Sequence, residues 1–350
     1  MGAFSAPLCF KHPARWSLDG RQSSIHPPCC ARSYSVYMAR FQIAFLLLFS
    51  GATLTLAAQQ TLADSHPASI SSTTQQTAIT TDGLSCGNFE WRSSSLSDKS
   101  VMLVPISING KQFIYQLDTG TDVLMPYGAA MEKGWSPLGK AVRIPDVRFA
   151  GMAFSSVKGF PAKEMPVSQD PKDPQGTVGL ELLLGKTFVI DFPRQRVCLL
   201  ERADLPERLD QAADWTPAEV RHGKLFVNLE LNSKKLDGIH YDTGSSLYTL
   251  DTSLSLWQEA TGKSGTKDAT THFSICCAWG HPLEGIGAPA SGDLKIGNHV
   301  YPKPMLTTEI ADPDSSWYQG TLGNALFTQS IVILDLGAHP RFGVIDSSRP

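Results

Sequence analysis

Two short segments carry the residues best suited to chemistry. Each is an Asp-Thr-Gly tripeptide followed by a hydroxyl residue, one at 118–121 and the other at 242–245. Asp118 and Asp242 each follow directly on an apolar or aromatic stretch typical of a buried strand. Two carboxylates held close together cannot both ionise, so such a pair shares one proton and supplies a general base and a general acid. We therefore predict that these two aspartates form a dyad that activates a water molecule.

The residues beside each aspartate are suited to holding the pair in place. Gly120 and Gly244 allow a tight turn behind the carboxylates. Thr119 and Thr243 can donate or accept hydrogen bonds across an interface between the two segments. We therefore expect both loops to support the dyad.

The same order of motifs occurs twice in the chain. Residues 104–121 match residues 227–245 with one insertion, and residues 176–191 match residues 320–335 without a gap. Each copy runs from a hairpin through Asp-Thr-Gly, a variable middle, a Gly-Thr-x-Gly element and a short helix to a final hairpin. A single Asp-Thr-Gly is weak evidence, because Asp-Gly turns are common between strands. Two copies in matched context indicate an internal repeat.

The repeat predicts an all-β protein of two homologous β-barrel-like lobes, related by a pseudo-twofold axis, with the active-site cleft between them. The lobes are expected at 96–210 and 211–350, because Asp and Pro interrupt any strand pattern near residues 203–220. Helix is expected only in three short stretches, residues 180–184, 254–260 and 325–328.

On these motifs the sequence resembles the pepsin-like aspartic proteases, in a compact bacterial two-lobed form that also looks like two fused retropepsin-type units. The resemblance covers about residues 100–348. It implies the acid protease fold and the hydrolysis of peptide bonds without a covalent intermediate, a metal or a cofactor. It also implies supporting roles. The threonines of the two triads would bond into the opposite loop, Thr121 and Ser245 would support the outer carboxylate oxygens, and Gly179 and Gly323 would pack under the loops.

The sequence departs from this family at two places. Pepsins carry a mobile hairpin that comes from the first lobe and covers the cleft, with a Tyr-Gly near its tip, but residues 125–146 leave little room for one. The second lobe is longer, and its residues 272–292 could form a covering loop. Asp122 stands where a small residue is usual, and an added acid beside the dyad would raise the pKa of the pair.

The first part of the chain has the composition of an export signal. Residues 38–58 combine a positive charge, an apolar run and small residues, as a secretory signal peptide does. An uncleaved membrane anchor is the alternative. If Met38 is the initiator, residues 1–37 are a non-functional upstream extension. Residues 59–95 are rich in Thr, Ser and Gln near their start and are expected to be a flexible tether or a propeptide. The protein would then be periplasmic or secreted, or membrane-anchored if the signal is retained.

The charge composition limits the classes of partner that the protein is expected to bind. The 350 residues carry 30 basic and 33 acidic side chains, and removing residues 1–58 leaves 25 basic and 32 acidic, so nucleic acid is not an expected partner. Four cysteines remain, which allow two disulfides in three connectivities. A zinc site is the competing reading, but no Cys-x-x-Cys accompanies them. The four are Cys86, Cys198, Cys276 and Cys277.

Taken together, the sequence predicts a monomeric, exported aspartic endopeptidase that acts on polypeptides and holds neither metal nor cofactor. The alternative is a catalytically silent two-lobed protein of the same fold that binds a peptide or a protein partner.

Overall fold

The computed structural model describes residues 79–128, 135–138, 140–162, 170, 172–278, 281–310 and 319–346. The expected upstream extension 1–37 and signal 38–58 lie outside the described residues. Among the helices of the described part, none combines the length and the apolar character that a membrane crossing requires.

The first lobe is built on an eight-stranded sheet in the order β5-β9-β4-β3-β7-β6, with β2 paired to β3 and β8 paired to β7. The β3–β4 hairpin turns at Asn109 and Gly110, whose positive φ angles of 52° and 75° suit a two-residue hairpin turn. A short 3-10 helix, η1 (Leu180–Leu183), follows β9. The strands are β2 (Glu90–Arg92), β3 (Val101–Ile108), β4 (Lys111–Leu117), β5 (Met125–Pro126), β6 (Ser136–Leu138), β7 (Ala141–Phe149), β8 (Met152–Gly159) and β9 (Gly176–Val178).

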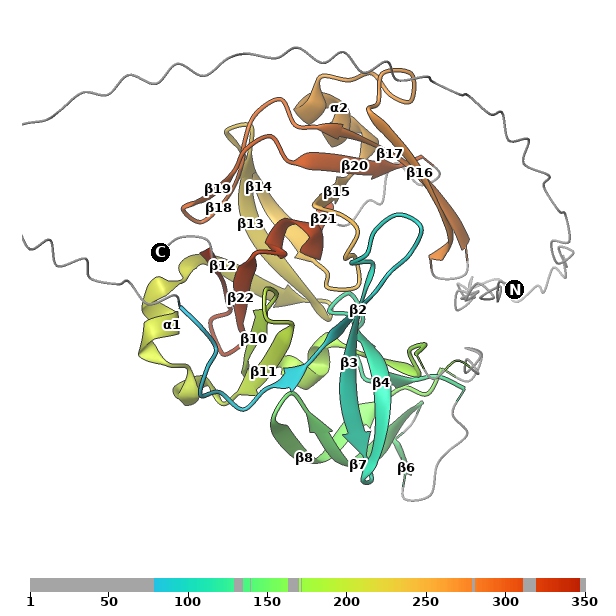
Figure 1. Ribbon diagram of the computed structural model, residues 1–350, viewed down its shortest axis with the longest axis vertical. Coiled ribbons are helices and arrows are strands. Elements are labelled where there is room, and N and C mark those ends of the chain that lie inside the picture. Colours follow the sequence, from blue (N-terminus) through green and yellow to red (C-terminus); the bar gives the residue numbers. More distant parts are fainter. Residues whose placement is uncertain are drawn as a thin grey trace, which may run out of the picture. The chain divides into compact units, whose positions relative to one another are not determined.

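The second lobe repeats this plan. β14 pairs in parallel with β21 as β4 pairs with β9, with Tyr241 opposite Leu322 where the first lobe has Leu117 opposite Val178. Its elements are β13 (Lys224–Leu231), β14 (Lys234–Tyr241), β15 (Leu250–Thr252), α2 (Leu254–Thr261), β16 (Thr271–Ala278), β17 (His281–Pro289), β18 (Leu294–Ile296), β19 (His299–Tyr301), β20 (Met305–Glu309), β21 (Gly320–Leu322) and η3 (Asn324–Phe327). The second lobe lies above the first in Figure 1.

Strands of both repeats join in one sheet in the order β1-β11-β10-β22-β23-β12, which continues into the second lobe. Its centre is the antiparallel pairing of β10 with β22, in which Val189 lies opposite Ile333. The two pairing strands occupy equivalent places in the two repeats, so the pairing is itself symmetric. The strands are β1 (Gly87–Asn88), β10 (Thr187–Asp191), β11 (Arg196–Leu200), β12 (Asp214–Arg221), β22 (Ser330–Asp335) and β23 (Arg341–Asp346).

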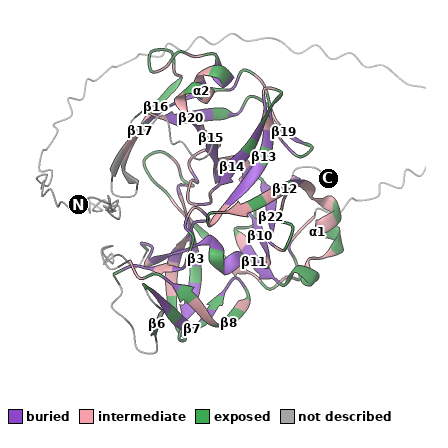
Figure 2. Ribbon diagram, turned by 180° about the vertical axis from the view of Figure 1, so that it is seen from behind, coloured by how far each residue is buried: buried purple, intermediate pink, exposed green. Residues whose placement is uncertain are grey.

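Apolar side chains cover both faces of this shared sheet, whose inner strands β11, β10, β22 and β23 are largely buried (Figure 2). One face joins a cluster that runs through both lobes, and the other packs against Leu209 of helix α1 (Glu207–Ala212) and against Leu84. The predicted fold class, all-β with two lobes built on the same plan, is confirmed. Helix α1 and the 3-10 helix η2 (Arg202–Asp204) were not expected, because Asp and Pro are frequent there; Pro206 instead directly precedes the first turn of α1.

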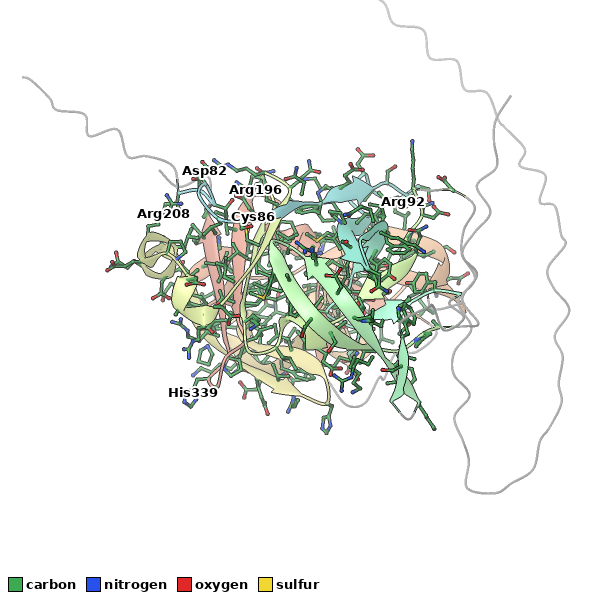
Figure 3. The ribbon with its side chains drawn as sticks, turned by 90° about the horizontal axis from the view of Figure 1, so that it is seen from below. Asp82, Cys86, Arg92, Arg196, Arg208 and His339 are labelled. Carbon is green, nitrogen blue, oxygen red and sulfur yellow. A yellow bond between two sulfur atoms is a disulfide. The ribbon has the colours of Figure 1, made fainter. Side chains whose placement is uncertain are left out.

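Residues 79–88 run along the edge of the shared sheet and residues 90–92 pair with β3 of the first lobe, although all of them lie in the range expected to be a tether or propeptide. Thr81 donates to the Asp191 carboxylate at 2.7 Å, and β1 pairs with β11. The predicted disulfide bonding is confirmed for one pair, Cys86–Cys198. Figure 3 shows Asp82, Arg196 and Arg208 gathered near this disulfide; Asp82 accepts from Arg196 through its side chain and from Arg208 through its carbonyl. The side chains of Cys276 and Cys277 lie outside the described residues.

Candidate active site

The two aspartates occupy equivalent positions at the ends of β4 and β14. The backbone N–H of Asp118 donates to the carbonyl of Val178 at 3.0 Å, and that of Asp242 donates to the carbonyl of Leu322 at 3.0 Å. Each loop is therefore held by the parallel strand next to it, β9 in one lobe and β21 in the other. The strand pairing therefore fixes the position of each aspartate at the end of its strand.

The threonines interlock the two loops. The backbone N–H of Thr119 donates to Thr243 Oγ1, and the N–H of Thr243 donates to Thr119 Oγ1, each at 3.0 Å. Thr119 Oγ1 also donates to the carbonyl of Tyr241 at 3.0 Å. Both threonines are fully buried. The structure thus brings the two Asp-Thr-Gly segments, 124 residues apart in the chain, into direct contact.

The two carboxylates have different hydrogen-bond environments. Asp242 Oδ1 accepts from the N–H groups of Gly120 at 3.0 Å and Gly244 at 2.8 Å, and its Oδ2 accepts from Ser245 Oγ at 3.0 Å. Asp118 Oδ2 accepts from Thr121 Oγ1 at 2.9 Å, while its buried Oδ1 receives no donor from the described residues. The neighbouring Asp242 can partner Asp118 Oδ1 only when one of the two carboxyls holds a proton.

The glycines of the two loops make room for the opposite carboxylate. A Cβ on Gly120 would overlap the Asp242 side chain, and a Cβ on Gly244 would overlap the Asp118 side chain. Neither glycine has a positive φ. A tight turn was the predicted reason for these glycines, whereas the structure shows that the close approach of the two loops is what requires glycine here.

Burial raises the pKa of Asp118 well above its usual value, and the adjacent Asp242 raises it further. The hydrogen bond from Thr121 and the positive charge of Lys224 act in the opposite direction. Asp118 is only 3% exposed, whereas Asp242 is partly exposed and receives three donors. The arrangement therefore favours a proton on Asp118, while the three donors around Asp242 suit a carboxylate acceptor.

Asp122, the added acid beside the dyad, is paired with a basic side chain. Its carboxylate pairs with Lys224 Nζ at 3.1 Å, so a positive charge from the second lobe stands beside it. The positive charge of Lys224 lowers the pKa of Asp118. Lys224 was not predicted as a site residue because it lies 106 positions after Asp118 in the sequence, and only the folded chain places it next to the first loop.

Gly179 and Gly323 lie beneath the two loops, where the resemblance places them. A Cβ on Gly179 would overlap the backbone of Thr121 and Val123, and a Cβ on Gly323 would overlap the carbonyls of Ser245 and Tyr248. Both contacts are with backbone, which cannot move aside without shifting the loop that carries the aspartate.

Two more titratable side chains lie near the dyad, and neither was predicted as a site residue. Tyr127 Oη and Thr177 Oγ1 are 2.5 Å apart, and burial raises the pKa of Tyr127 to about 12. The centroid of the His240 ring lies 5.9 Å from that of Phe226, and burial lowers the pKa of His240. Among the described residues, no group of three or more His, Cys, Asp or Glu side chains could hold a metal ion.

The hairpins of the two lobes differ. In the first lobe β7 and β8 turn at Ala150 and Gly151, where the carbonyl of Ala150 accepts from Leu199 of β11 at 2.9 Å, so this turn lies on the shared sheet. In the second lobe β16 and β17 form a hairpin within the range expected to make a covering loop, and they extend from β20 (Figure 1). The Phe273 ring lies 5.6 Å from that of Tyr248, six residues after Asp242.

Comparison with known proteins gives the following likenesses. No description of a known protein family matches the sequence, and no curated protein matches it. Among solved structures, the chain is similar to conglutin gamma from lupine seeds at a TM-score of 0.46, with 11% identity over 75% of this chain and 94% of that one. The chain is also similar to basic 7S globulin from soybean, at a TM-score of 0.45 with 10% identity over 75% of this chain and 94% of that one. It is similar to the aspartic proteinase from Irpex lacteus at a TM-score of 0.45, with 9% identity over 71% of this chain and 95% of that one. These likenesses assign no activity to the chain.

Asp251, on β15 beyond the second loop, is a third carboxyl with a displaced pKa. It accepts from Thr307 Oγ1 at 2.7 Å, and burial together with the nearby Glu309 raises its pKa to about 7. Between pH 4 and pH 7 the unfolded chain therefore ionises at this position before the folded chain does, so folding stability falls as the pH rises through that range.

We expect Asp251→Asn to remove this loss, because the amide oxygen can still accept from Thr307. Its free energy of unfolding should exceed that of the wild type by at most about 4 kcal/mol at neutral pH and differ little below pH 4. Urea unfolding across this pH range measures it, with the exposed Asp98→Asn as control. A wild-type pH dependence in the Asp251→Asn protein would contradict the assignment.

Proposed function

We propose that this protein is an aspartic endopeptidase that hydrolyses peptide bonds with Asp118 and Asp242. The observation that carries the proposal is the interlocked pair of loops, in which the N–H of Gly120 in the first loop donates to the carboxylate of Asp242 in the second. A pair of carboxyls in such different environments supplies both an acid and a base within one site.

In the proposed mechanism, the Asp242 carboxylate takes a proton from a water molecule as its oxygen adds to the carbonyl carbon of the scissile bond. Asp118 gives its proton to the carbonyl oxygen, and a tetrahedral diol forms. Asp242 then passes its proton to the amide nitrogen, the C–N bond breaks, and Asp118 recovers a proton from a diol hydroxyl. Both carboxyls return to their starting states, and no covalent intermediate forms.

We also propose a compartment, a substrate class and an oligomeric state for the enzyme. The Cys86–Cys198 disulfide supports an oxidising compartment, in keeping with a periplasmic or secreted protein. The substrate would be a polypeptide, and the protein would act as a monomer without metal or cofactor.

A second candidate function is a silent protein of this fold that binds a peptide or protein partner without cutting it. The observation that favours it is the first-lobe hairpin β7–β8, whose turn packs on β11 instead of covering the dyad. An enzyme of this class closes over its substrate to exclude water and to orient the bond.

One experiment separates the two functions. The purified protein is incubated with a diverse peptide mixture from acid to neutral pH, and new peptide termini are identified by mass spectrometry, with and without a statine-type transition-state analogue. Dyad-dependent products that the analogue suppresses support the endopeptidase. A folded protein that retains peptides on a binding assay but yields no products supports the silent function and overturns the first.

A further inference from the structure

A lysine of the second lobe reaches the first aspartate loop. Lys224 is the first residue of β13, and its Nζ donates to the carbonyl of Gly120 and pairs with the Asp122 carboxylate at 3.1 Å. The Lys224 side chain is 18% exposed, while that of Asp122 is 55% exposed. The lysine therefore joins the backbone of one loop to the opposite lobe, at a residue whose N–H donates to Asp242.

The turn before Lys224 is shaped for this contact. His222 and Gly223 adopt positive φ angles of 50° and 71°, which close the two-residue hairpin between β12 and β13. A Cβ on Gly223 would overlap the Asp122 carboxylate. The turn thus packs directly on Asp122, and the next residue, Lys224, meets that carboxylate.

The contact exists on one side of the pseudo-twofold axis only. In the repeat, Lys224 corresponds to Val101 at the start of β3, and Asp122 corresponds to Ser246. Ser246 is buried and donates to the carbonyl of Thr243 at 2.9 Å. The charged pair is therefore a second difference between the two loops, beside the unequal hydrogen bonding of the two carboxylates.

Other titratable groups lie around this contact, and none of those described below supplies a second unpaired positive charge beside Lys224. His240 on β14 is buried and tends to stay neutral, because burial lowers its pKa. Tyr127 and Tyr241 are also neutral, since burial raises their pKa values. Glu181 of η1 pairs with Lys158 at 3.6 Å, and Glu219 lies 3.9 Å from Arg221, whose guanidinium stacks over the Phe226 ring. Lys224 is the cation that lowers the pKa of Asp118.

We propose that Lys224 is a positioning residue of the site: it fixes the Gly120 backbone from the opposite lobe, and its charge, balanced by Asp122, sets the pH range in which the aspartate pair holds a single proton. This inference rests on the proposed function for its effect on catalysis. Its electrostatic part can be measured on the folded protein whether or not peptides are cleaved.

The test uses variants that change the charge in opposite directions. Lys224→Met removes the cation, so the Asp118 carboxyl should titrate at higher pH; Asp122→Asn leaves the cation unbalanced, so it should titrate at lower pH. We expect each change to amount to roughly 0.5–1 pH unit. Lys224→Arg keeps the charge and should titrate as the wild type does. The readout is the ¹³C NMR titration of labelled aspartate carboxyls, assigned with Asp118→Asn, together with the pH profile of kcat/KM.

The outcomes are distinct. Opposite displacements in Lys224→Met and Asp122→Asn, with recovery in Lys224→Arg, support the inference. Equal or same-direction displacements in folded variants overturn it, because a purely structural contact would respond alike to the loss of either partner. If Lys224→Met does not fold, the downward displacement in Asp122→Asn decides, since this half-exposed residue can lose its charge without a cavity. A wild type that titrates as expected but cleaves no peptide refutes the proposed function and leaves the inference standing.

Discussion

Replacing Asp242 with asparagine is expected to lower kcat/KM for peptide cleavage by about 10³–10⁴-fold, because an amide cannot take the proton of the attacking water. The side chains have the same size, so the fold should persist. The amide would, however, face the N–H groups of Gly120 and Gly244, which now donate to the carboxylate. Peptide cleavage assayed across the pH range, with circular dichroism as the check on folding, measures the effect.

Asp118→Asn should reduce cleavage by a similar factor, since it removes the proton that the carbonyl oxygen would receive. Its effect on stability should differ, because burial and Asp242 hold the pKa of Asp118 high. A carboxyl of this kind costs the folded state stability as the pH rises, so Asp118→Asn should be more stable than the wild type at neutral pH. Asp98→Asn, on an exposed loop, serves as the control for both variants. Full activity in either dyad variant would show that the aspartates are not the catalytic pair.

The second large effect is expected at the glycines beneath the loops. In Gly323→Ala the new methyl group would meet the carbonyls of Ser245 and Tyr248, and in Gly179→Ala it would meet the backbone of Thr121 and Val123. Because the backbone on both sides belongs to packed strands and loops, we expect each substitution to cost about 3 kcal/mol or more of the free energy of unfolding. Chemical denaturation measures this loss.

The matched control is Gly87→Ala. A methyl group there has only ordinary contacts, the nearest being Ala150 Cα at 3.7 Å. Its free energy of unfolding should change by less than about 1 kcal/mol. If all three alanine variants were equally stable, the close packing beneath the loops would not constrain the site.

Much of the fold follows from the sequence because its patterns are local and repeated. The Asn109–Gly110 turn, the apolar residues of β3 and the duplicated Gly-Thr-x-Gly element each specify a short-range structure, and the repeat then relates the two lobes. Helix α1 was missed for the opposite reason. Its six residues carry no strong helical period, and Leu209 alone is buried against the shared sheet.

Only those features of the site that occur in both repeats could be predicted from the sequence. The pairing of Asp118 with Asp242 and the supporting threonines follow from the repeated motif. The difference between the two carboxyls does not, because it depends on contacts between residues far apart in the chain. Lys224 beside Asp122 and the two glycine N–H groups that both donate to Asp242 are such contacts, and no spacing within one motif signals them.

The path of the chain through the shared sheet has a consequence for the order of assembly. Strands β22 and β23, residues 330–346, lie between β10 of the first repeat and β12, so neither repeat has its full set of neighbours until these late residues have been synthesised. A ribosome-bound chain that stops short of them leaves β10 with an open edge, and open strand edges recruit other chains. The shared sheet is therefore completed only when the last strands are available, as β22 pairs with β10 and β23 with β12.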